Sequence, residues 1–416
     1  MDTRDKRILI LKFTPRLSIF LDALADTLKR RGASVRLASE LITWRQVPDD
    51  FQVSPTLLEE ITAYDRAIYN PNHLAGLGRQ INHYAARCLY HLEQLIDRYH
   101  PTDIVLWNGW MVLTQAAIHL ARERSIRVWY MENGAIPDTL QLDSHGVNYA
   151  SLIAGRDRQF FMDANLDFDP DMKITTPHSC PVTLWQRLET LMRYINHFGM
   201  WFLVYIFWKN FIPDQVGKWM RMHLPQDKVV LPERFVFVPL QVQDDTQIIM
   251  YSPLVKQMEE LVERCYTAIE QVDQTLRLVV KEHPQDFGRH SYHTLHKKYP
   301  DIIWLRKYPI DKFLKKANVV VAINSGTGVE ALIKYKPVIT LGQAFYSVPG
   351  IVRHANSWEE LPSLIENSLT QSVDSNAINK FLGYLQKRHL ILGNWNRFSD
   401  ITLEAASDRI LKSEDE

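Results

Sequence analysis

Cysteine is scarce in this sequence. Only Cys88, Cys180 and Cys265 occur among its 416 residues, and they are widely separated. Such spacing provides neither a disulfide framework nor a paired zinc-binding motif. The sequence therefore predicts a protein of a reducing compartment. The N-terminal residues lack a small-residue cleavage site and are not expected to form a signal peptide.

Long hydrophobic runs are also missing. The most apolar segment, residues 198–208 (FGMWFLVYIFW), would span about 16 Å as a helix, roughly half of a bilayer's hydrocarbon core. It is too short to cross a bilayer, and two interpretations stay open. It is either a buried helix or an aromatic segment in the membrane interface, where Arg193, His197 and Lys209 would meet anionic headgroups.

An excess of either charge is absent, since 48 Lys and Arg residues balance 48 Asp and Glu residues. A neutral chain is not expected to offer a broad basic surface, so no nucleic-acid partner is predicted. The apolar fraction of 46% and the charged fraction of 23% are typical of a soluble globular protein and exclude a disordered or fibrous chain. At this length we expect two or three domains.

What the sequence does contain is a repeated alternation of apolar strand patterns and amphipathic helix patterns. In the first half the predicted strands are 8–13, 34–38, 103–107 and 126–130, and the predicted helices are 20–30, 74–99 and 111–122. In the second half the predicted strands are 235–242, 276–280, 302–305, 319–323 and 337–341, and the predicted helices are 254–271, 290–298, 328–334, 375–389 and 398–412.

Strands that alternate with helices indicate an α/β fold with parallel sheets and right-handed crossovers. We predict two Rossmann-like parallel-sheet domains that face a cleft and are joined by a helical linker. The expected parts are an N-terminal Rossmann-like domain (1–180), a helical, aromatic connector (181–230), a C-terminal Rossmann-like domain (231–372) and C-terminal helices (373–416).

Ligands of open α/β sheets bind outside the carboxyl ends of the strands, so polar residues after predicted strands are candidate site residues. The segment 324–328 (Asn-Ser-Gly-Thr-Gly) follows strand 319–323 and opens a helix. Helix capping explains one hydroxyl, but the whole turn is typical of a phosphate site at the positive end of a helix. It is not a Walker A loop, because no lysine follows the second glycine. Glu330 either binds ribose hydroxyls or favours the helix dipole.

Two other strand ends carry ionisable groups. Pro284 keeps His283 extended after strand 276–280, so the imidazole can donate to a phosphate or protonate a leaving group. Asp244 and Asp245 follow strand 235–242. Alternation sends their side chains to opposite sides, so either one of them faces the cleft as a nucleophile or general base, or both only form a turn.

The first half offers one further acid. Glu132 follows strand 126–130, in a segment that continues to Asn148. It is either the second carboxylate that glycosyl chemistry needs or a solvated loop acid.

Four segments, in order along the chain, resemble the capsule polysaccharide biosynthesis family of KpsS/KpsC-like β-Kdo glycosyltransferases. They are ENGxxPxTLQxDxxGVN (132–148), PLQxxxDxQ (239–247), the His-Pro pair (283–284) and NSGTGxEAL (324–332), which KPVITLGxAFY (336–346) follows. Each falls at a predicted strand end, and together they cover most of positions 100–350.

The resemblance implies a GT-B-like fold and the transfer of Kdo from CMP-Kdo to a lipid or Kdo-lipid acceptor with retention. Asp245 then matches the nucleophile, with Asp244 as the open alternative, and Glu132 matches the acid/base. The residues implied for nucleotide-sugar binding are Gln241, Lys281, His283 (also catalytic), Asn324, Ser325, Gly326, Thr327 and Glu330. Asp143 and Tyr346 are expected near the acceptor or the cleft.

The resemblance also implies partners and a location. No cofactor and no metal are expected, because CMP is a good leaving group that needs phosphate binding more than a Lewis acid. The expected partners are a CMP-sugar donor, a lipid-linked acceptor, the inner-membrane surface and the capsule export machinery, and the expected location is the cytoplasm at the inner face of the inner membrane. Two alternatives stay open: a CMP-sialic-acid transferase or nucleotide-sugar epimerase on the same fold, and a non-catalytic capsule export component.

Overall fold

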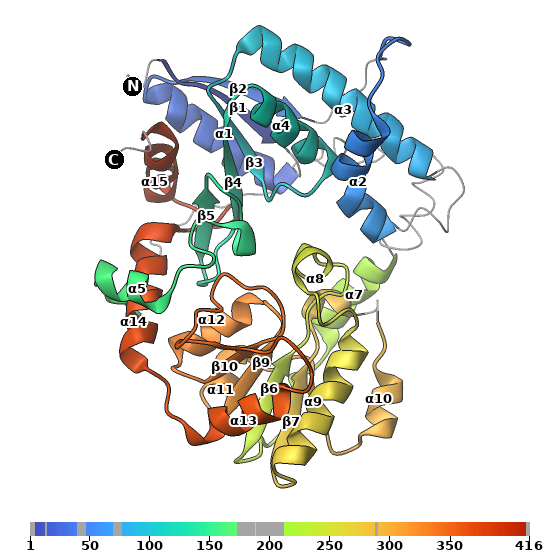
Figure 1. Ribbon diagram of the computed structural model, residues 1–416, viewed down its shortest axis with the longest axis vertical. Helices are drawn as coiled ribbons and strands as arrows, with labels where there is room; N and C mark the ends of the chain where they lie inside the picture. The colour runs from blue at the N-terminus through green and yellow to red at the C-terminus, as the bar shows by residue number, and fades with distance from the viewer. Residues whose placement is uncertain are drawn as a thin grey trace. The chain divides into compact units, whose positions relative to one another are not determined.

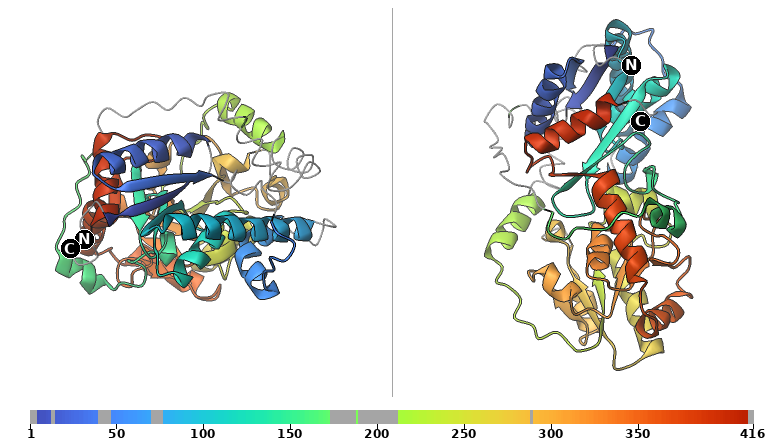
Figure 2. Two further views of the ribbon diagram at one scale, coloured as in Figure 1. Left: turned by 90° about the horizontal axis from the view of Figure 1, so that it is seen from above. Right: turned by 90° about the vertical axis from the view of Figure 1, so that its left-hand side faces the viewer.

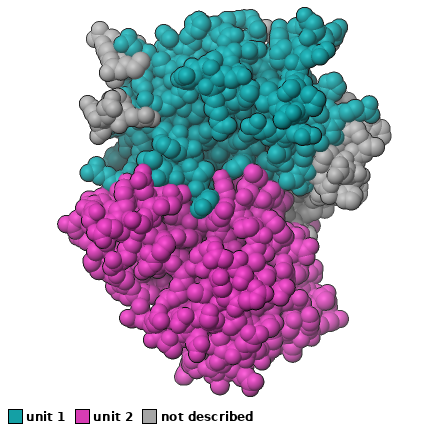
Figure 3. All heavy atoms as spheres, viewed as in Figure 1, with its two compact units in different colours: residues 1–152, 170–204, 388–416 teal, residues 153–169, 205–387 magenta. Residues whose placement is uncertain are grey.

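The computed structural model describes residues 5–12, 15–39, 47–69, 77–172, 188, 212–287 and 290–412. The apolar segment 198–208 and most of the predicted connector lie outside the described residues. The chain divides into two compact units (Figure 3): unit 1 comprises Met1–Leu152, Pro170–Val204 and Arg388–Glu416, and unit 2 comprises Ile153–Asp169 and Tyr205–Lys387. Each unit holds one six-stranded sheet, which confirms the prediction of two Rossmann-like α/β domains. Within the described ranges, no helix is both long enough and apolar enough to pass through a bilayer.

The sheet of unit 1 is parallel at its centre and antiparallel at one edge. Its strands are β1 (Arg7–Lys12), β2 (Ser34–Ser39), β3 (Asp103–Trp107), β4 (Arg127–Asn133), β5 (Thr139–Asp143) and β12 (Leu390–Leu392), in the spatial order β12-β5-β4-β3-β1-β2. β1 to β4 pair in parallel, whereas β5 pairs antiparallel with both β4 and β12. Four successive side chains of β1, residues 8–11, are fully buried, as expected for a strand covered on both faces.

Helices lie on both faces of this sheet, as Figure 2 shows in its left view. On one side, α1 (Pro15–Arg30) packs against α15 (Asp400–Leu411). On the other, α3 (Leu77–Tyr99) packs against α2 (Pro55–Tyr69) and α4 (Val112–Glu123). Phe20 of α1 meets Phe398 edge-on, with the ring centroids 5.1 Å apart.

The sheet of unit 2 is parallel throughout (Figure 1), in the order β11-β10-β9-β6-β7-β8. Its strands are β6 (Phe235–Pro239), β7 (Arg277–Lys281), β8 (Ile303–Leu305), β9 (Val319–Ala322), β10 (Val338–Thr340) and β11 (Arg353–His354). β6 is buried on both faces. Val236 and Val238 join the core formed with α9 (Met258–Val272) and α13 (Leu361–Thr370), whereas Phe237 stacks on Phe313 at 4.9 Å.

The remaining helices of unit 2 connect these strands or pack at its rim. They are α5 (Arg158–Ala164), α7 (Ile212–His223), α8 (Thr246–Tyr251), α10 (His293–Lys298), α11 (Ile310–Leu314), α12 (Gly326–Ile333) and α14 (Ser375–Tyr384). α12 follows β9 and packs on β9 and β10, so its N-terminus lies at the carboxyl edge of the sheet.

Two parts of the chain differ from the prediction. The segment 373–416, expected as one group of helices, is divided: α14 packs on α5 in unit 2, whereas β12 and α15 belong to unit 1. The reason is the pairing of β12 with β5, in which Ile391 lies opposite Leu140. In addition, residues 153–169 were expected in the first domain and lie in unit 2.

Candidate functional site

The strand ends that the sequence singled out meet at one edge of the unit 2 sheet. β9, β6 and β7 are neighbours in that order and run parallel, so their carboxyl ends share an edge. The segments that follow these strands are 323–327, 240–245 and 282–284. This edge is where open α/β sheets bind ligands, so we take it as the candidate site.

Gln241 and Asn324 join two of these strand ends through their side-chain amides. Gln241 Nε2 donates to Asn324 Oδ1 at 3.0 Å, and the backbone N–H of Asn324 donates to Gln241 Oε1 at 3.2 Å. Asn324 Nδ2 also donates to the carbonyl oxygens of Gln247 and Tyr251 in α8, at 2.8 and 3.3 Å. Both residues were predicted to bind the nucleotide sugar, and the structure uses their amides to hold the loops of the site together.

The turn after β9 presents donors at the start of α12. Ser325 has extended backbone at the N-cap position, but its hydroxyl does not cap the helix. The Ser325 Oγ atom is buried and has no hydrogen-bond partner among the described residues. The first N–H groups of a helix likewise lack intrahelical acceptors. A buried hydroxyl and unpaired N–H groups at the positive end of a helix suit an anionic ligand, as the sequence predicts for Ser325, Gly326 and Thr327.

Tyr346 packs against this turn and is hydrogen-bonded to its backbone. It is fully buried, and its hydroxyl donates to the carbonyl oxygen of Ser325 at 2.7 Å. A Cβ atom at Gly328 would lie only 2.5 Å from the Tyr346 hydroxyl, so this position has no room for a side chain. The sequence placed Tyr346 near the acceptor or the cleft, and burial instead makes it a positioning residue for the turn.

Lys281, at the end of β7, and Glu330, in α12, are partly buried and exert a weak electrostatic effect on each other. Burial lowers the pKa of Lys281, and attraction to Asp227, Glu282 and Glu330 opposes this effect. Burial also raises the pKa of Glu330, which Lys334 and Lys281 counteract. Burial thus disfavours the charged form of both groups, and a phosphate bound nearby would favour the ammonium form of Lys281.

His283 is held in one orientation by its own backbone. Its Nδ1 atom accepts a hydrogen bond from the backbone N–H of Gln285 at 3.2 Å, at the start of a short 3-10 turn that Pro284 opens. Because Nδ1 is the acceptor, the neutral imidazole carries its proton on Nε2. The predicted donor group of His283 is thus the Nε2–H.

Asp245 differs from its neighbour Asp244 in burial. Asp244 is exposed, whereas Asp245 is partly buried and caps α8 by accepting from the backbone N–H of Gln247 at 2.8 Å. Burial raises the pKa of the Asp245 carboxyl, although hydrogen bonds from Gln247 and Thr246 oppose the rise. A carboxylate with little water around it is a stronger base and nucleophile, so Asp245 suits the predicted role better than Asp244 does.

The sequence predicted that Glu132 of unit 1 follows a strand. In the structure Glu132 lies inside β4. β4 extends to Asn133 because β5, a strand that the sequence did not predict, pairs with it and places Gln141 opposite Glu132. Glu132 Oε1 accepts from the backbone N–H of Asn133 at 2.8 Å. The turn between the strands needs Gly134, since a Cβ atom there would lie 2.0 Å from Thr139 Oγ1.

Asp143 organises the loop that follows β5. Its carboxylate is buried and accepts from the backbone N–H groups of His145 and Leu152, at 2.7 and 3.0 Å. Gln141 and His389, which sequence reasoning did not single out, lie beside it, with Gln141 Nε2 3.1 Å from His389 Nε2. Gln141 stands in the quoted motif and could have been found, whereas nothing near His389 pointed to it. Asp143 was expected near the acceptor or the cleft, and in the structure its hydrogen bonds hold the loop after β5.

The described residues contain no group of three His, Cys, Asp or Glu side chains arranged to hold a metal ion. Two six-stranded α/β units place the chain in the class of two-unit Rossmann-like proteins. The turn 324–328 at the carboxyl edge of the unit 2 sheet, which suits an anion, is called the anion-type turn below. A model of the capsule polysaccharide biosynthesis protein family matches residues 102–380, and the chain belongs to this family. The resemblance seen in the sequence is thereby confirmed.

Curated relatives and a solved structure are similar to the chain. It is 28% identical over 288 residues to the capsule polysaccharide export protein KpsS of Escherichia coli, which covers 62% of this chain and 72% of KpsS. It is 32% identical over 314 residues to the protein FixF of Sinorhizobium fredii, covering 75% of this chain and 66% of FixF. The KpsC β-Kdo 2,7 transferase of Thermosulfurimonas dismutans aligns over 97% of this chain and 99% of that chain, at 16% identity and a TM-score of 0.46.

Proposed function

We propose that this protein is a retaining glycosyltransferase of capsular polysaccharide biosynthesis, which transfers Kdo from CMP-Kdo to a lipid or Kdo-lipid acceptor. The observation that carries the proposal is the meeting of three strand ends in unit 2, which puts the desolvated Asp245 carboxylate at the same sheet edge as an anion-type turn. Membership of the capsule polysaccharide biosynthesis family supports the substrate class.

In this proposal the donor's phosphate binds at the start of α12. Ser325 Oγ, the first N–H groups of the helix, Lys281 and the Nε2–H of His283 are the donors that would hold it. Glu330 would accept from ribose hydroxyls. The positive charge of Lys281 and of the helix dipole offsets the charge that builds up on CMP as it leaves.

The reaction proceeds in two displacements. The Asp245 carboxylate attacks the anomeric carbon, the bond from that carbon to the phosphate oxygen breaks, and CMP leaves with the electron pair. The acceptor hydroxyl then attacks the same carbon and releases Asp245, while a base takes the hydroxyl proton. Two inversions return the original configuration. The family resemblance implies Glu132 for this base.

The proposed acceptor carries a lipid, so the protein would work at the cytoplasmic face of the inner membrane with the capsule export machinery. The aromatic character of residues 198–208 supports such a location, because aromatic side chains favour the membrane interface.

The test follows CMP release and protein mass together. Purified protein is incubated with CMP-Kdo, with and without a short-chain phospholipid acceptor, and intact mass is measured for one added Kdo residue. We expect acceptor-dependent release and an adduct that Asp245→Asn abolishes and Asp244→Asn, the matched control, preserves. Release without an adduct would argue against Asp245 as the nucleophile. Turnover with CMP-sialic acid but not with CMP-Kdo would overturn the donor assignment. No CMP release from either donor would overturn the proposal that the protein is a glycosyltransferase.

A further inference from the structure

The loop between β12 and α15 forms a tight turn with Trp395 at its tip. The backbone N–H of Asn394 donates to the carbonyl oxygen of Arg397 at 3.0 Å, and the N–H of Arg397 donates to that of Asn394 at 3.1 Å. Asp138, in the turn between β4 and β5, holds this loop in place. Its Oδ2 atom accepts from Arg397 Nη1 at 3.1 Å, and its carbonyl oxygen accepts from the N–H of Gly393 at 2.7 Å.

Two contacts fix the ring of Trp395 at the carboxyl ends of β3 and β4. Its indole Nε1 atom donates to Asn133 Oδ1, in the last residue of β4, at 3.0 Å. Its ring meets that of Trp107, the last residue of β3, edge-on with the ring centroids 6.3 Å apart. The loop thus brings a tryptophan from the far end of the chain to the strand end that carries Glu132.

Asn133 connects Trp395 to Glu132. Its backbone N–H and its Nδ2 atom both donate to Glu132 Oε1, at 2.8 and 3.2 Å. An indole N–H can only donate a hydrogen bond, and an ionised carboxylate can only accept one. Asn133 must therefore present its oxygen to Trp395 and its NH₂ group to Glu132, and turning the amide over would break both bonds. One orientation of the amide is fixed in this way, and the Glu132 carboxylate is fixed with it.

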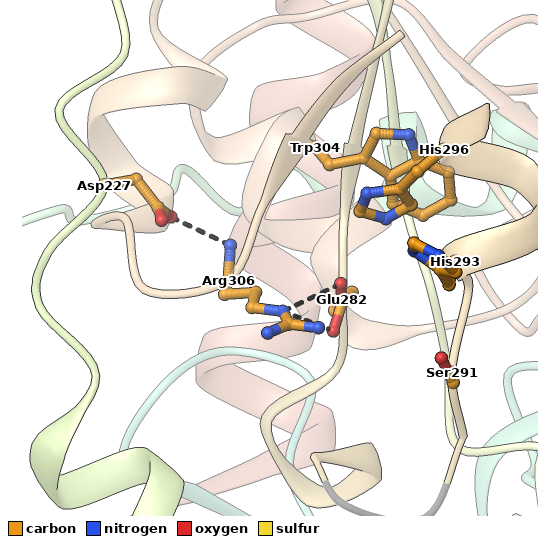
Figure 4. Close-up of a pocket in the computed structure, with 7 residues that line it drawn as sticks. All are labelled: Asp227, Glu282, Ser291, His293, His296, Trp304 and Arg306. Atoms are coloured by element: carbon orange, nitrogen blue, oxygen red, sulfur yellow. Dashed lines mark hydrogen bonds and ion pairs between the residues drawn. The ribbon is translucent and has the colours of Figure 1, made fainter. Parts of the chain in front are cut away.

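Figure 4 shows a carboxylate that is held in a different way. In a cavity of unit 2, both oxygens of Glu282 accept from Arg306 Nε, at 3.0 Å each. This guanidinium favours the ionised carboxylate and opposes the rise in pKa that burial gives Glu282. The two bonds from Asn133 to Glu132 come from neutral groups, which orient a carboxylate with a smaller effect on its pKa. Neutral donors suit a carboxylate that has to take up a proton.

We infer that Trp395 is a positioning residue for the carboxylate of Glu132 and acts through the side-chain amide of Asn133. The inference rests on the proposed function, in which Glu132 is the base of the second displacement. In that step the acceptor oxygen bonds to the anomeric carbon, the bond from this carbon to Asp245 breaks, and the hydroxyl proton passes to Glu132. A carboxylate that rotates freely is correctly oriented for less of the time, so the loss of the Trp395 N–H slows this step and not the first displacement.

The test separates the two displacements. The adduct is formed with CMP-Kdo alone, the short-chain phospholipid acceptor is then added, and intact mass follows the loss of the adduct. Trp395→Phe keeps a ring against Trp107 but loses the N–H. We expect it to form the adduct at the wild-type rate and to transfer the sugar about tenfold more slowly.

Trp129→Phe is the matched control for the loss of an indole N–H. Trp129 also belongs to the unit 1 sheet, and its Nε1 atom donates to Asp103 Oδ1 at the same distance of 3.0 Å. This variant should transfer the sugar at the wild-type rate, and circular dichroism checks that each variant is folded. Equal slowing in the two tryptophan variants would mean that Trp395 only stabilises the unit.

Glu132→Gln distinguishes the failure of the inference from the failure of the proposed base. Slow transfer by Glu132→Gln together with wild-type transfer by Trp395→Phe would overturn the inference and leave the base in place. Wild-type transfer by Glu132→Gln would reject the base, and with it the positioning role of Trp395.

The connection between the two residues can also be measured without turnover. In isotope-labelled full-length protein, the indole N–H signal of Trp395 in nuclear magnetic resonance spectra is assigned by its absence from Trp395→Phe. We expect this signal to shift with pH as Glu132 ionises, because Asn133 bonds to both side chains, and we expect Glu132→Gln to abolish the shift. A Trp395 signal with the same pH dependence in wild type and Glu132→Gln would refute the connection.

Discussion

The hydroxyl of Tyr346 donates a hydrogen bond to the carbonyl oxygen of Ser325 at 2.7 Å, beneath the turn that opens α12. The ring fills the space that a side chain at position 328 would need. A residue with no exposed surface therefore sets the shape of the anion-type turn, and its removal should affect both stability and binding.

Tyr346→Phe tests this relationship. The variant loses one buried hydrogen bond, so we expect the free energy of unfolding to fall by about 1 kcal/mol. We also expect CMP to bind more weakly, because the turn loses its support. Tyr335→Phe, at an exposed tyrosine just after α12, is the matched control and should change neither quantity. If Tyr346→Phe is destabilised but binds CMP as tightly as the wild type does, Tyr346 contributes to stability and not to ligand binding.

Asn324→Ala tests the brace between the strand ends. The change removes the hydrogen bonds to Gln241 and α8 and leaves their buried partners unsatisfied. We expect a loss of roughly 2–3 kcal/mol in the free energy of unfolding, measured by chemical denaturation. Asn376→Ala, in the exposed first turn of α14, should cost far less. Equal losses in the two variants would mean that the brace is not a stabilising feature.

Asp245→Asn should separate function from stability. Burial raises the pKa of this carboxyl in the folded state, so the folded protein is less stable above that pKa than it would be with a neutral group. Asparagine keeps the capping oxygen and carries no charge. We expect the unfolding temperature to stay level or rise while transfer is lost. A clear fall in the unfolding temperature would indicate a structural role.

The pH profile of transfer gives an independent reading of Asp245. The nucleophile must be ionised, so transfer decreases as the pH falls through its pKa. Because burial raises that pKa, the midpoint of the acidic limb should lie above the ordinary aspartate value of about 3.9. Initial rates across the acidic range measure it, with Asp244→Asn expected to follow the wild type. A midpoint at or below the ordinary value would contradict the assignment.

His389 predicts a second pH dependence, this time in the stability of unit 1. Burial, with a smaller effect from Arg409, lowers the pKa of His389 to about 3. Above the unfolded value near 6.5 the histidine has no effect. Below pH 6.5 the histidine binds a proton in the unfolded chain but not in the folded protein. The free energy of unfolding therefore falls by up to about 1.4 kcal/mol for each pH unit until pH 3. Denaturation of wild type and His389→Gln should diverge below pH 6.5, and parallel curves would refute the effect.

Much of the fold was predictable because local patterns dominate it. β3 was expected at residues 103–107, where it lies, and β6, β7 and β9, the strands of unit 2 after which site residues stand, were all identified. What failed depends on contacts between distant residues. β12, for example, is a strand because it pairs with β5, which lies more than two hundred residues earlier in the chain.

The candidate site shows the same division. Sequence and resemblance indicated which segments matter, and the parallel order of β9, β6 and β7 brings the three in unit 2 together. Sequence and resemblance could not distinguish a polar group that is available to a ligand from one that already has a hydrogen-bond partner within the protein. The amides of Gln241 and Asn324 satisfy each other, and Tyr346 is buried. The pairing of Glu282 with Arg306 is equally invisible in sequence, since twenty-odd residues separate them.

The contribution of β12 to the unit 1 sheet has a consequence for how the protein is made. A ribosome releases β5 long before β12 exists, and the whole of unit 2 emerges in between. During that interval the outer edge of β5 has unpaired backbone groups, which invite pairing with another chain. The sheet of unit 1 is complete only when residues 390–392 pair with β5. Bringing together residues so far apart in the chain has an entropic cost, which makes this pairing a late step. A chain cut short before residue 390 would keep its complete second unit and an open first one.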